Sequence, residues 1–171
     1  CKDADIVCTG IFGLNSEKVY ALRDVFISVP FVGHEFLDKQ RLQESNIVVA
    51  NAPGCNKEAV VEWILGMILL YFRRLNTLQN VSDMTREDIL TTGKSMYGKT
   101  IAILGKGNIG SHLGNVCTSL GMNVVFFGRG DDLLASVQDA DIVANCLSVT
   151  ETSTGLLGKT FFSSLKKGSF F

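Results

Sequence analysis

The chain has 171 residues, of which 46% are hydrophobic and 19% are charged, and its formal net charge at pH 7 is −1. This length is enough for a buried core in one soluble domain, or in one domain and part of another. A nearly balanced charge gives no electrostatic basis for binding nucleic acid or an anionic membrane surface, so we expect neither partner.

The cysteines are five in number and widely separated: Cys1, Cys8, Cys55, Cys117 and Cys146. They form no CxxC pair and no spacing typical of metal ligands, so we expect no metal site and reduced, mostly buried thiols in a cytoplasmic protein. The sequence shows no signal peptide. The most apolar run, residues 59–72, is too short to span a membrane.

Two kinds of segment alternate along the first 51 residues. Apolar, β-branched runs predict strands at 4–9, 25–29 and 46–51. Helical spacing between them predicts helices at 16–22 and 36–44. This βαβαβ order predicts an α/β fold with a parallel sheet covered by helices.

A long helix is predicted at 58–75, after the break at Asn51-Ala52-Pro53-Gly54. It is apolar over most of its surface, so we expect it to be buried on more than one side. Residues 76–95 are polar and predict a crossover segment. Beyond them, apolar runs predict strands at 100–104, 123–127 and 141–145, then a short helix at 161–166 and the start of a strand at 168–171.

A Gly-x-Gly-x-x-Gly motif follows the strand at 100–104 and opens a helical pattern. In a dinucleotide-binding turn, Gly105 would permit the tight turn, Gly107 would let backbone amides approach a pyrophosphate, and Gly110 would let the helix pack closely on the sheet. The amides of Asn108 and Ile109 at the helix N-terminus would face the phosphates. A strand before the motif and another at βαβ distance favour this interpretation over an ordinary βα turn.

Gly128 and Arg129 follow the strand at 123–127, where dinucleotide-binding folds usually place an Asp or Glu that bonds the adenosine ribose and favours NAD. Here no carboxylate would repel a 2′-phosphate, and a guanidinium could pair with one. We therefore predict NADP(H) in preference to NAD(H). Two alternatives stay open: Arg129 could face solvent, and Asp131 or Asp132 could reach the ribose and restore NAD binding.

Several short motifs occur in a definite order: Asn51-Ala52-Pro53-Gly54, Asn56 with Val60-Val61-Glu62, Arg73, Tyr97-Gly98-Lys99-Thr100, Gly121-Met122-Asn123-Val124, Asp139-Ala140-Asp141-Ile142-Val143 and Leu165-Lys166-Lys167-Gly168. With the glycine motif, their order and spacing resemble the D-isomer-specific 2-hydroxyacid dehydrogenases, which include phosphoglycerate dehydrogenases and glyoxylate/hydroxypyruvate reductases. The resemblance covers nearly the whole chain.

This resemblance implies two doubly wound parallel-sheet domains. Residues 1–51 would be the C-terminal part of a flavodoxin-like substrate domain, and residues 52–171 the N-terminal part of a Rossmann NAD(P)-binding domain. In the family, a catalytic Arg, Glu and His come after the segment that ends here at Phe171. His34 and His112 do not match the catalytic His motif, so we expect a fragment without catalytic residues and without measurable turnover.

The resemblance also implies further contacts. Backbone amides of Val32 and Gly33 would bind the substrate carboxylate, and Cys146, Leu147 and Ser148 would line the cofactor, with Ser148 in place of the usual proline. We do not expect Cys146 to act as a nucleophile, because no base is placed beside it. The segment 128–140 is shorter than in the family, so a strand or helix edge near the adenine is expected to be missing.

The leading hypothesis is an NAD(P)-dependent oxidoreductase that transfers hydride between nicotinamide and a small 2-hydroxy or 2-oxo acid. It would form a homodimer through the helix Ala59–Leu75, whose many large apolar side chains half a domain cannot bury. The alternative is a dinucleotide-binding module without catalysis, such as a sensor or a corepressor-like protein. The identity of the acid is not encoded in these motifs.

Overall fold

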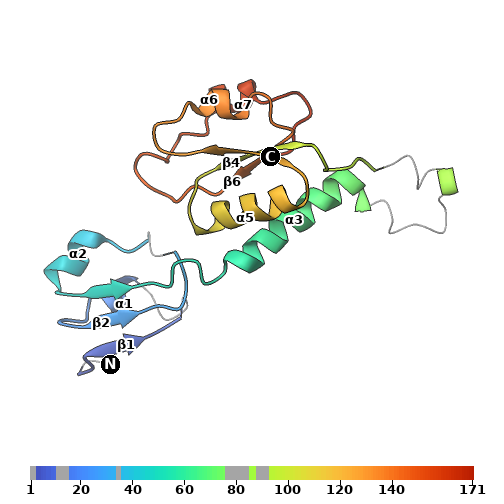
Figure 1. The fold of residues 1–171 in the computed structure, drawn as a ribbon. Coiled ribbons are helices and arrows are strands. Elements are labelled where there is room, and N and C mark those ends of the chain that lie inside the picture. The colour runs from blue at the N-terminus through green and yellow to red at the C-terminus, as the bar shows by residue number, and fades with distance from the viewer. Residues whose placement is uncertain (1–2, 11–15, 34–35, 76–84, 88–92) are drawn as a thin grey trace. The chain divides into compact units, whose positions relative to one another are not determined.

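The computed structural model describes residues 3–10, 16–33, 36–75, 85–87 and 93–171. The chain divides into two compact units, Cys1–Asn56 and Lys57–Phe171. Each unit contains its own three-stranded sheet, and every strand pairing in both sheets is parallel (Figure 1). The α/β fold class is therefore confirmed.

The first unit is a parallel sheet with helices on one face. Its elements are β1 (Ile6–Cys8), α1 (Ser16–Val19), β2 (Phe26–Ser28), α2 (Lys39–Glu44) and β3 (Val48–Ala50), with sheet order β1-β2-β3. Because successive strands are added in one direction, right-handed crossovers place both helices on the same side. The core on that side contains Val19, Tyr20, Val25, Ile27, Val29 and Ile47.

On the opposite face of this sheet, Ile6, Phe26 and Val48 lie side by side in register and are exposed within the chain. The expected helix at 36–44 begins later, at Lys39, because the Asp38 side chain accepts hydrogen bonds from the backbone amides of Gln40 and Arg41, at 2.9 and 3.2 Å. A carboxylate in this position satisfies amides that the first turn of a helix leaves without partners.

The second unit has helices on both faces of its sheet. Its elements are α3 (Lys57–Arg73), β4 (Thr100–Leu104), α5 (Asn108–Ser119), β5 (Asn123–Phe127), α6 (Leu133–Val137), β6 (Ile142–Asn145) and α7 (Lys159–Ser164). The sheet order β5-β4-β6 makes β4 the central strand. Figure 1 shows α3 and α5 on one side of this sheet and α6 and α7 on the other, so the unit is doubly wound.

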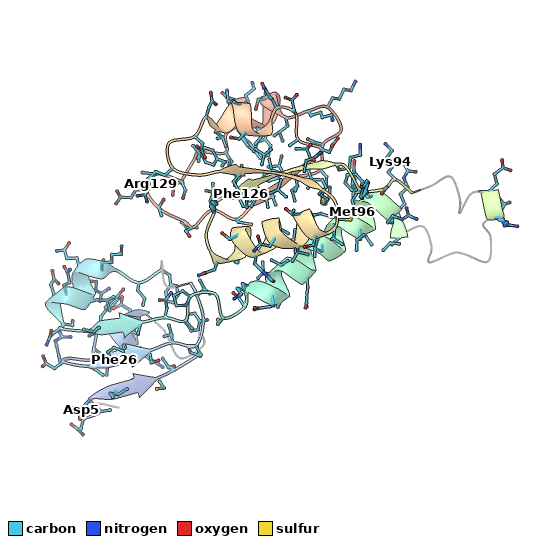
Figure 2. The ribbon with its side chains drawn as sticks, viewed as in Figure 1. Asp5, Phe26, Lys94, Met96, Phe126 and Arg129 are labelled. Carbon is cyan, nitrogen blue, oxygen red and sulfur yellow. The ribbon has the colours of Figure 1, made fainter. Side chains whose placement is uncertain are left out.

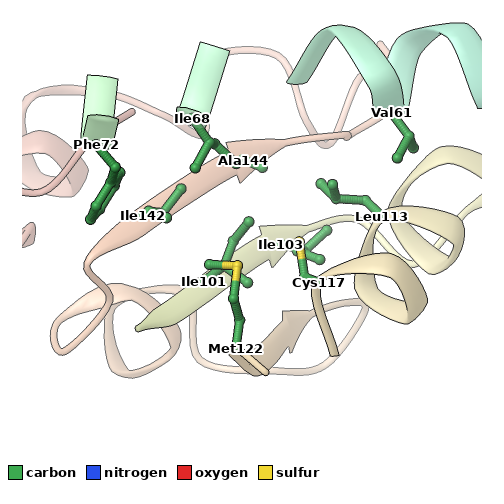
Figure 3. Packing of buried hydrophobic residues seen from close by; sticks show 10 residues of the cluster. All are labelled: Val61, Ile68, Phe72, Ile101, Ile103, Leu113, Cys117, Met122, Ile142 and Ala144. Atoms are coloured by element: carbon green, nitrogen blue, oxygen red, sulfur yellow. The ribbon is translucent and has the colours of Figure 1, made fainter. Parts of the chain in front are cut away.

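Strand β4 explains why both faces need covering. Its residues Ile101, Ala102, Ile103 and Leu104 are all fully buried. Ile101 and Ile103 pack with residues of α3 and α5, including Val61, Ile68, Leu113 and Cys117 (Figure 3). Ala102 and Leu104 pack on the other face against Val137, Ala140 and Phe161.

The structure of this unit differs from the sequence-based expectations at α6 and at residues 168–171. Helix α6 was not predicted; its N-cap is Asp132, which accepts hydrogen bonds from the amides of Leu134 and Ala135. The strand expected at 168–171 is reduced to a single bridge between Phe170 and Ile142. Within the chain, helix α3 buries Val61, Ile68 and Phe72 and leaves Trp63 67% exposed, so its burial on more than one side stays a prediction.

The cysteines are also less buried than expected. Cys117 is buried and Cys146 half-buried, whereas Cys8 and Cys55 are exposed, and all four are free thiols. Cys1 and most of the predicted crossover at 76–95 lie outside the described residues. None of the helices in the described part of the chain is long and apolar enough to cross a membrane.

Asp141 ties the starts of β4 and β6 together. Its Oδ2 accepts the amide of Thr100 at 3.0 Å, and its Oδ1 lies 2.8 Å from Nζ of Lys166 and 3.7 Å from Nζ of Lys99. Partial burial acts to raise the pKa of this carboxyl, but the Lys166 and Thr100 hydrogen bonds and the Lys99 charge together hold it below its ordinary value. The ionised form therefore stabilises the fold.

We predict that Asp141→Asn lowers the free energy of unfolding at pH 7 by about 1 kcal/mol, because an amide keeps an acceptor but loses both ion pairs. Since the folded pKa is depressed, the lost contribution is fully present above about pH 4 and disappears as the pH falls through the folded pKa. Urea unfolding from pH 7 to pH 3 should show the two stabilities converge. The exposed neighbour Asp139, changed to Asn, serves as the control, and an equal loss there would contradict the assignment.

Candidate functional site

The candidate site lies at the carboxyl end of β4. From β4 the chain crosses through α5 to β5 on one side, and β6 pairs with β4 on the other. In open α/β sheets, ligands bind outside the strand ends at such a reversal of strand order. The glycine motif begins with the first residue after β4, Gly105.

Two glycines of the motif are required by the fold itself. Gly105 has φ +100°, and a Cβ there would lie 2.7 Å from the carbonyl oxygen of Cys146. A Cβ on Gly110 would collide with the carbonyl oxygen of Gly105. The turn is held by the Gly105 amide donating to Phe127, 2.9 Å, and by the Cys146 amide donating to Leu104, 2.8 Å. The backbone is therefore too closely packed at Gly105 and at Gly110 for a side chain at either position.

Gly107 is not required in this way. Its φ is −82°, and a Cβ there would meet no atom within 4 Å. It is the N-cap residue of α5, and no side chain caps this helix, so the first amides, including those of Asn108 and Ile109, lack a side-chain acceptor. Open space in front of uncapped amides at a helix N-terminus fits a phosphate or pyrophosphate.

A first hollow, of about 440 Å³, lies beside the end of β5; we call it the strand-end hollow. Its lining includes Gly128, Arg129, Leu147, Ser148, Thr150 and Ser153. A second hollow, of about 470 Å³, lies at the start of α5; we call it the helix-start hollow. Its lining includes Lys57, Lys106, Asn108, Ser111, His112 and Asn115.

The loop after β5 determines which charges face the strand-end hollow. The Gly128 amide donates to Oδ2 of Asp131 at 2.8 Å, and Asp132 is held by the amides at the start of α6. Arg129 is exposed at this loop (Figure 2) and has no hydrogen bond or ion pair with any residue that the structure describes. Both carboxylates are thus engaged by backbone amides, whereas the guanidinium is available.

The loop after β6 forms the other wall of the strand-end hollow. The Leu147 amide donates to the Asn145 side chain at 3.1 Å, and the carbonyl of Ser148 accepts the Ser153 hydroxyl at 2.7 Å. Thr150 and Ser153 bond each other, and sequence reasoning missed both, although hydroxyl residues three apart are a known turn pattern. Burial raises the pKa of the Cys146 thiol, which disfavours a reactive thiolate.

Val32 and Gly33 belong to the first unit and are half-buried. The Val32 carbonyl accepts the Asn51 side-chain amide at 2.7 Å, and the Ala52 amide donates to the carbonyl of Phe31 at 3.1 Å. This loop is therefore anchored by its own unit. The other predicted contact residues all lie in the second unit, whereas His34 is outside the described residues.

His112, which does not match the catalytic His motif, is half-buried on α5 beside the helix-start hollow. Among the residues that the structure describes, no three His, Cys, Asp or Glu side chains gather in a way that could hold a metal ion. The arrangement at the end of β4 consists instead of backbone amides, two hollows and basic side chains, which suits an anionic ligand.

Comparison with known proteins agrees with this geometry. Residues 65–171 match the model of the family described as D-isomer specific 2-hydroxyacid dehydrogenase, NAD binding domain. D-lactate dehydrogenase of Staphylococcus aureus (strain MRSA252) is 25% identical over 186 residues, covering 98% of this chain and 56% of that protein. Hydroxypyruvate reductase of Thermotoga maritima is 23% identical over 148 residues, covering 80% of this chain and 48% of that protein.

Solved structures show the same fold. The NAD+-bound 3-phosphoglycerate dehydrogenase of Entamoeba histolytica superposes with a TM-score of 0.77 at 22% identity, covering 96% of this chain and 53% of that one. An acyclic imino acid reductase in complex with NADPH and D-Arg gives 0.82 at 16% identity, with 96% and 57% coverage. The chain spans about half the length of the curated relatives it matches. With a family model matched over residues 65–171, the chain belongs to the D-isomer-specific 2-hydroxyacid dehydrogenase family, and the matched part is its NAD-binding domain.

Proposed function

We propose that this protein serves hydride transfer between a nicotinamide dinucleotide and a small 2-hydroxy or 2-oxo acid. The observation that carries the proposal is Gly107, which has open space around it at the uncapped start of α5. A bound nicotinamide would supply or accept the hydride. The chain's own contribution is to bind the pyrophosphate over Gly107, Asn108 and Ile109 and to hold the adenosine in the strand-end hollow, beside Leu147 and Ser148.

The domain roles follow from this placement. Residues from about 52 onward would bind the dinucleotide, and residues 1–51 would contribute to substrate binding. In the first unit, the Val32 carbonyl is fixed by Asn51. Because a peptide group is planar, this bond also fixes the direction of the Gly33 amide, which would donate to the substrate carboxylate. D-lactate dehydrogenase and hydroxypyruvate reductase, two of the relatives, are named for different acids, and we propose the class of acid to which both belong.

The charge around the strand-end hollow favours NADP(H). Arg129 is available to a 2′-phosphate, and the two nearest carboxylates on its loop, Asp131 and Asp132, already accept backbone amides. Turning Asp131 toward a ribose would break its bond to Gly128. Of the similar structures, one holds NAD+ and another holds NADPH.

A non-catalytic sensor or corepressor-like module is the second candidate, because dinucleotide binding alone would account for the arrangement at the end of β4. The two candidates differ in what happens to the bound dinucleotide: an oxidoreductase transfers hydride between it and a 2-hydroxy or 2-oxo acid, whereas a module only binds it. A cytoplasmic location is part of the proposal for either, since free thiols at Cys8 and Cys55 suit a reducing compartment.

We predict that Gly107→Ala and Gly110→Ala separate binding from folding. Gly107→Ala should cost about 1 kcal/mol of stability or less as a change of N-cap, but should weaken dinucleotide binding at least about tenfold, because a methyl group would stand where the pyrophosphate approaches. Gly110→Ala should lower the free energy of unfolding by about 3 kcal/mol, because its methyl group would collide with the Gly105 carbonyl. Calorimetric titration and thermal unfolding measure the two effects. Unchanged dinucleotide affinity in Gly107→Ala would contradict the proposed position of the pyrophosphate.

We predict that the chain binds NADPH more tightly than NADH and that Arg129→Ala weakens NADPH binding about tenfold while leaving NADH nearly unchanged. One charge-assisted bond to a phosphate is worth about 1.5–3 kcal/mol, and exposure of Arg129 places the effect at the low end. Arg86→Ala, which removes an exposed guanidinium outside both hollows, is the control. Tighter NADH binding, or equal losses for both cofactors in Arg129→Ala, would overturn the preference.

We predict a homodimer that packs through an apolar surface on α3 and just beyond its end. The exposed apolar residues of this surface are Trp63, Leu69, Leu70, Tyr71 and Leu75. Full burial of a large apolar side chain is favourable by about 1.5–3 kcal/mol relative to exposure, so covering this surface with a second copy would stabilise the dimer. Trp63→Glu should raise the dimer dissociation constant more than tenfold, about 1.4 kcal/mol, in sedimentation experiments. Val149→Glu, at an equally exposed apolar position after β6, should not; a monomeric unsubstituted chain at micromolar concentration speaks against the dimer.

We also predict that the 171 residues alone show no measurable turnover of glyoxylate, hydroxypyruvate or phosphohydroxypyruvate. Loss of a general acid/base alone costs about 10²–10⁴ in rate, and loss of electrostatic stabilisation multiplies that factor. Steady consumption of NADPH with any of these acids, absent in a Gly107→Ala control, would contradict this expectation.

A further inference from the structure

Lys106 occupies the first variable position of the Gly-x-Gly-x-x-Gly motif, between Gly105 and Gly107. Lys106 lines both the strand-end hollow and the helix-start hollow. It therefore stands where a ligand that extends from one hollow to the other must pass. In the proposed dinucleotide, the part between the adenosine and the start of α5 is the pyrophosphate.

The charge of Lys106 is not neutralised by the protein. Its Nζ lies 5.2 Å from the centroid of the Phe126 ring, and no carboxylate of the described residues forms an ion pair with it. The ring is fixed in place, since it packs so closely on Gly114 that a Cβ there would collide with it. Lys57, the other lysine of the helix-start hollow, already lies 3.4 Å from the Glu58 carboxylate.

We propose that the Lys106 ammonium binds the pyrophosphate of the dinucleotide and so determines affinity for NAD(H) and NADP(H) alike. This inference rests on the proposed function. The amides at the start of α5 offer only the partial charge of a helix N-terminus, about half an elementary charge. A pyrophosphate carries two negative charges, which the partial charge of the helix N-terminus does not balance. The Lys106 ammonium adds a full positive charge and three hydrogen-bond donors.

Lys106 and Arg129 would then act on different parts of the same ligand. Arg129 lines the strand-end hollow but not the helix-start hollow, which fits a group on the adenosine side. Only NADP(H) has a phosphate on that ribose, whereas both cofactors have the pyrophosphate. The two basic residues therefore predict two different patterns of loss when each is removed.

The test is calorimetric titration of the 171-residue chain with NADPH and with NADH, using K106M, K106R, R129A and K159M. Methionine keeps an apolar stem against the Phe126 ring and removes the charge. K106M should raise both dissociation constants by a similar factor, about tenfold. K159M removes an exposed lysine at the start of α7, outside both hollows, and should change neither.

Ionic strength and charge retention provide two further readouts that packing alone would not move. The difference between the unsubstituted chain and K106M should shrink as salt rises from about 0.05 to about 0.5 M, because the Debye length falls. K106R keeps the charge and should bind both cofactors within about threefold of the unsubstituted chain. An equal loss in K106R and K106M would assign the effect to packing and overturn the proposal.

The remaining outcomes separate this inference from the function on which it rests. Tight binding of both cofactors by K106M would overturn the role of Lys106 and leave the dinucleotide site standing. A loss confined to NADPH would place Lys106 at the 2′-phosphate and overturn its assignment to the pyrophosphate. Failure of the unsubstituted chain to bind either cofactor would overturn both the site and the inference.

Discussion

The contact between the backbones of Gly105 and Gly110 is the constraint on which the candidate site depends. The first turn of α5 begins so close to the end of β4 that a Cβ on Gly110 would collide with the Gly105 carbonyl. This closeness brings the start of α5 to the strand end, where β5 and β6 also terminate. The helix N-terminus, the loop carrying Arg129 and the loop carrying Ser148 consequently meet at one edge of the sheet.

The same constraint explains why Gly107 is informative. At Gly105 and Gly110, glycine is accounted for by the fold, and a protein with no ligand at this edge would need it equally. At Gly107 the fold does not require glycine, because the space in front of the residue is open. A residue with an oxygen-bearing side chain would cap the helix better there. Leaving the amides uncapped makes physical sense when an external anion is their acceptor.

The sequence predicted best what depends on neighbours along the chain. Strand β4, the glycine turn and α5 were predicted because residues 100–116 carry a continuous apolar run, three glycines at fixed spacing and a helical pattern. Helix α6 was missed, although Asp132 is a recognisable cap, because its five residues are too few to show a period. The exposure of Trp63 and of the Ile6–Phe26–Val48 row was not predictable, because an apolar pattern indicates which face can be buried and not what covers it.

Under the proposed function, side chains would recognise the cofactor in the second unit, and backbone groups would recognise the substrate in the first. In the second unit, Lys106 lines both hollows and Arg129 lines only the strand-end hollow, so the proposed contacts would let charge distinguish a pyrophosphate from a 2′-phosphate. In the first unit, the loop at Val32 is anchored by the Asn51 side-chain amide, and under the proposal it would present the Gly33 backbone amide to the substrate. A backbone amide recognises a carboxylate, which every 2-hydroxy acid has, and does not distinguish one acid from another. Preference for a cofactor can therefore be argued from this chain residue by residue, whereas preference among acids must come from side chains that contact the rest of the substrate.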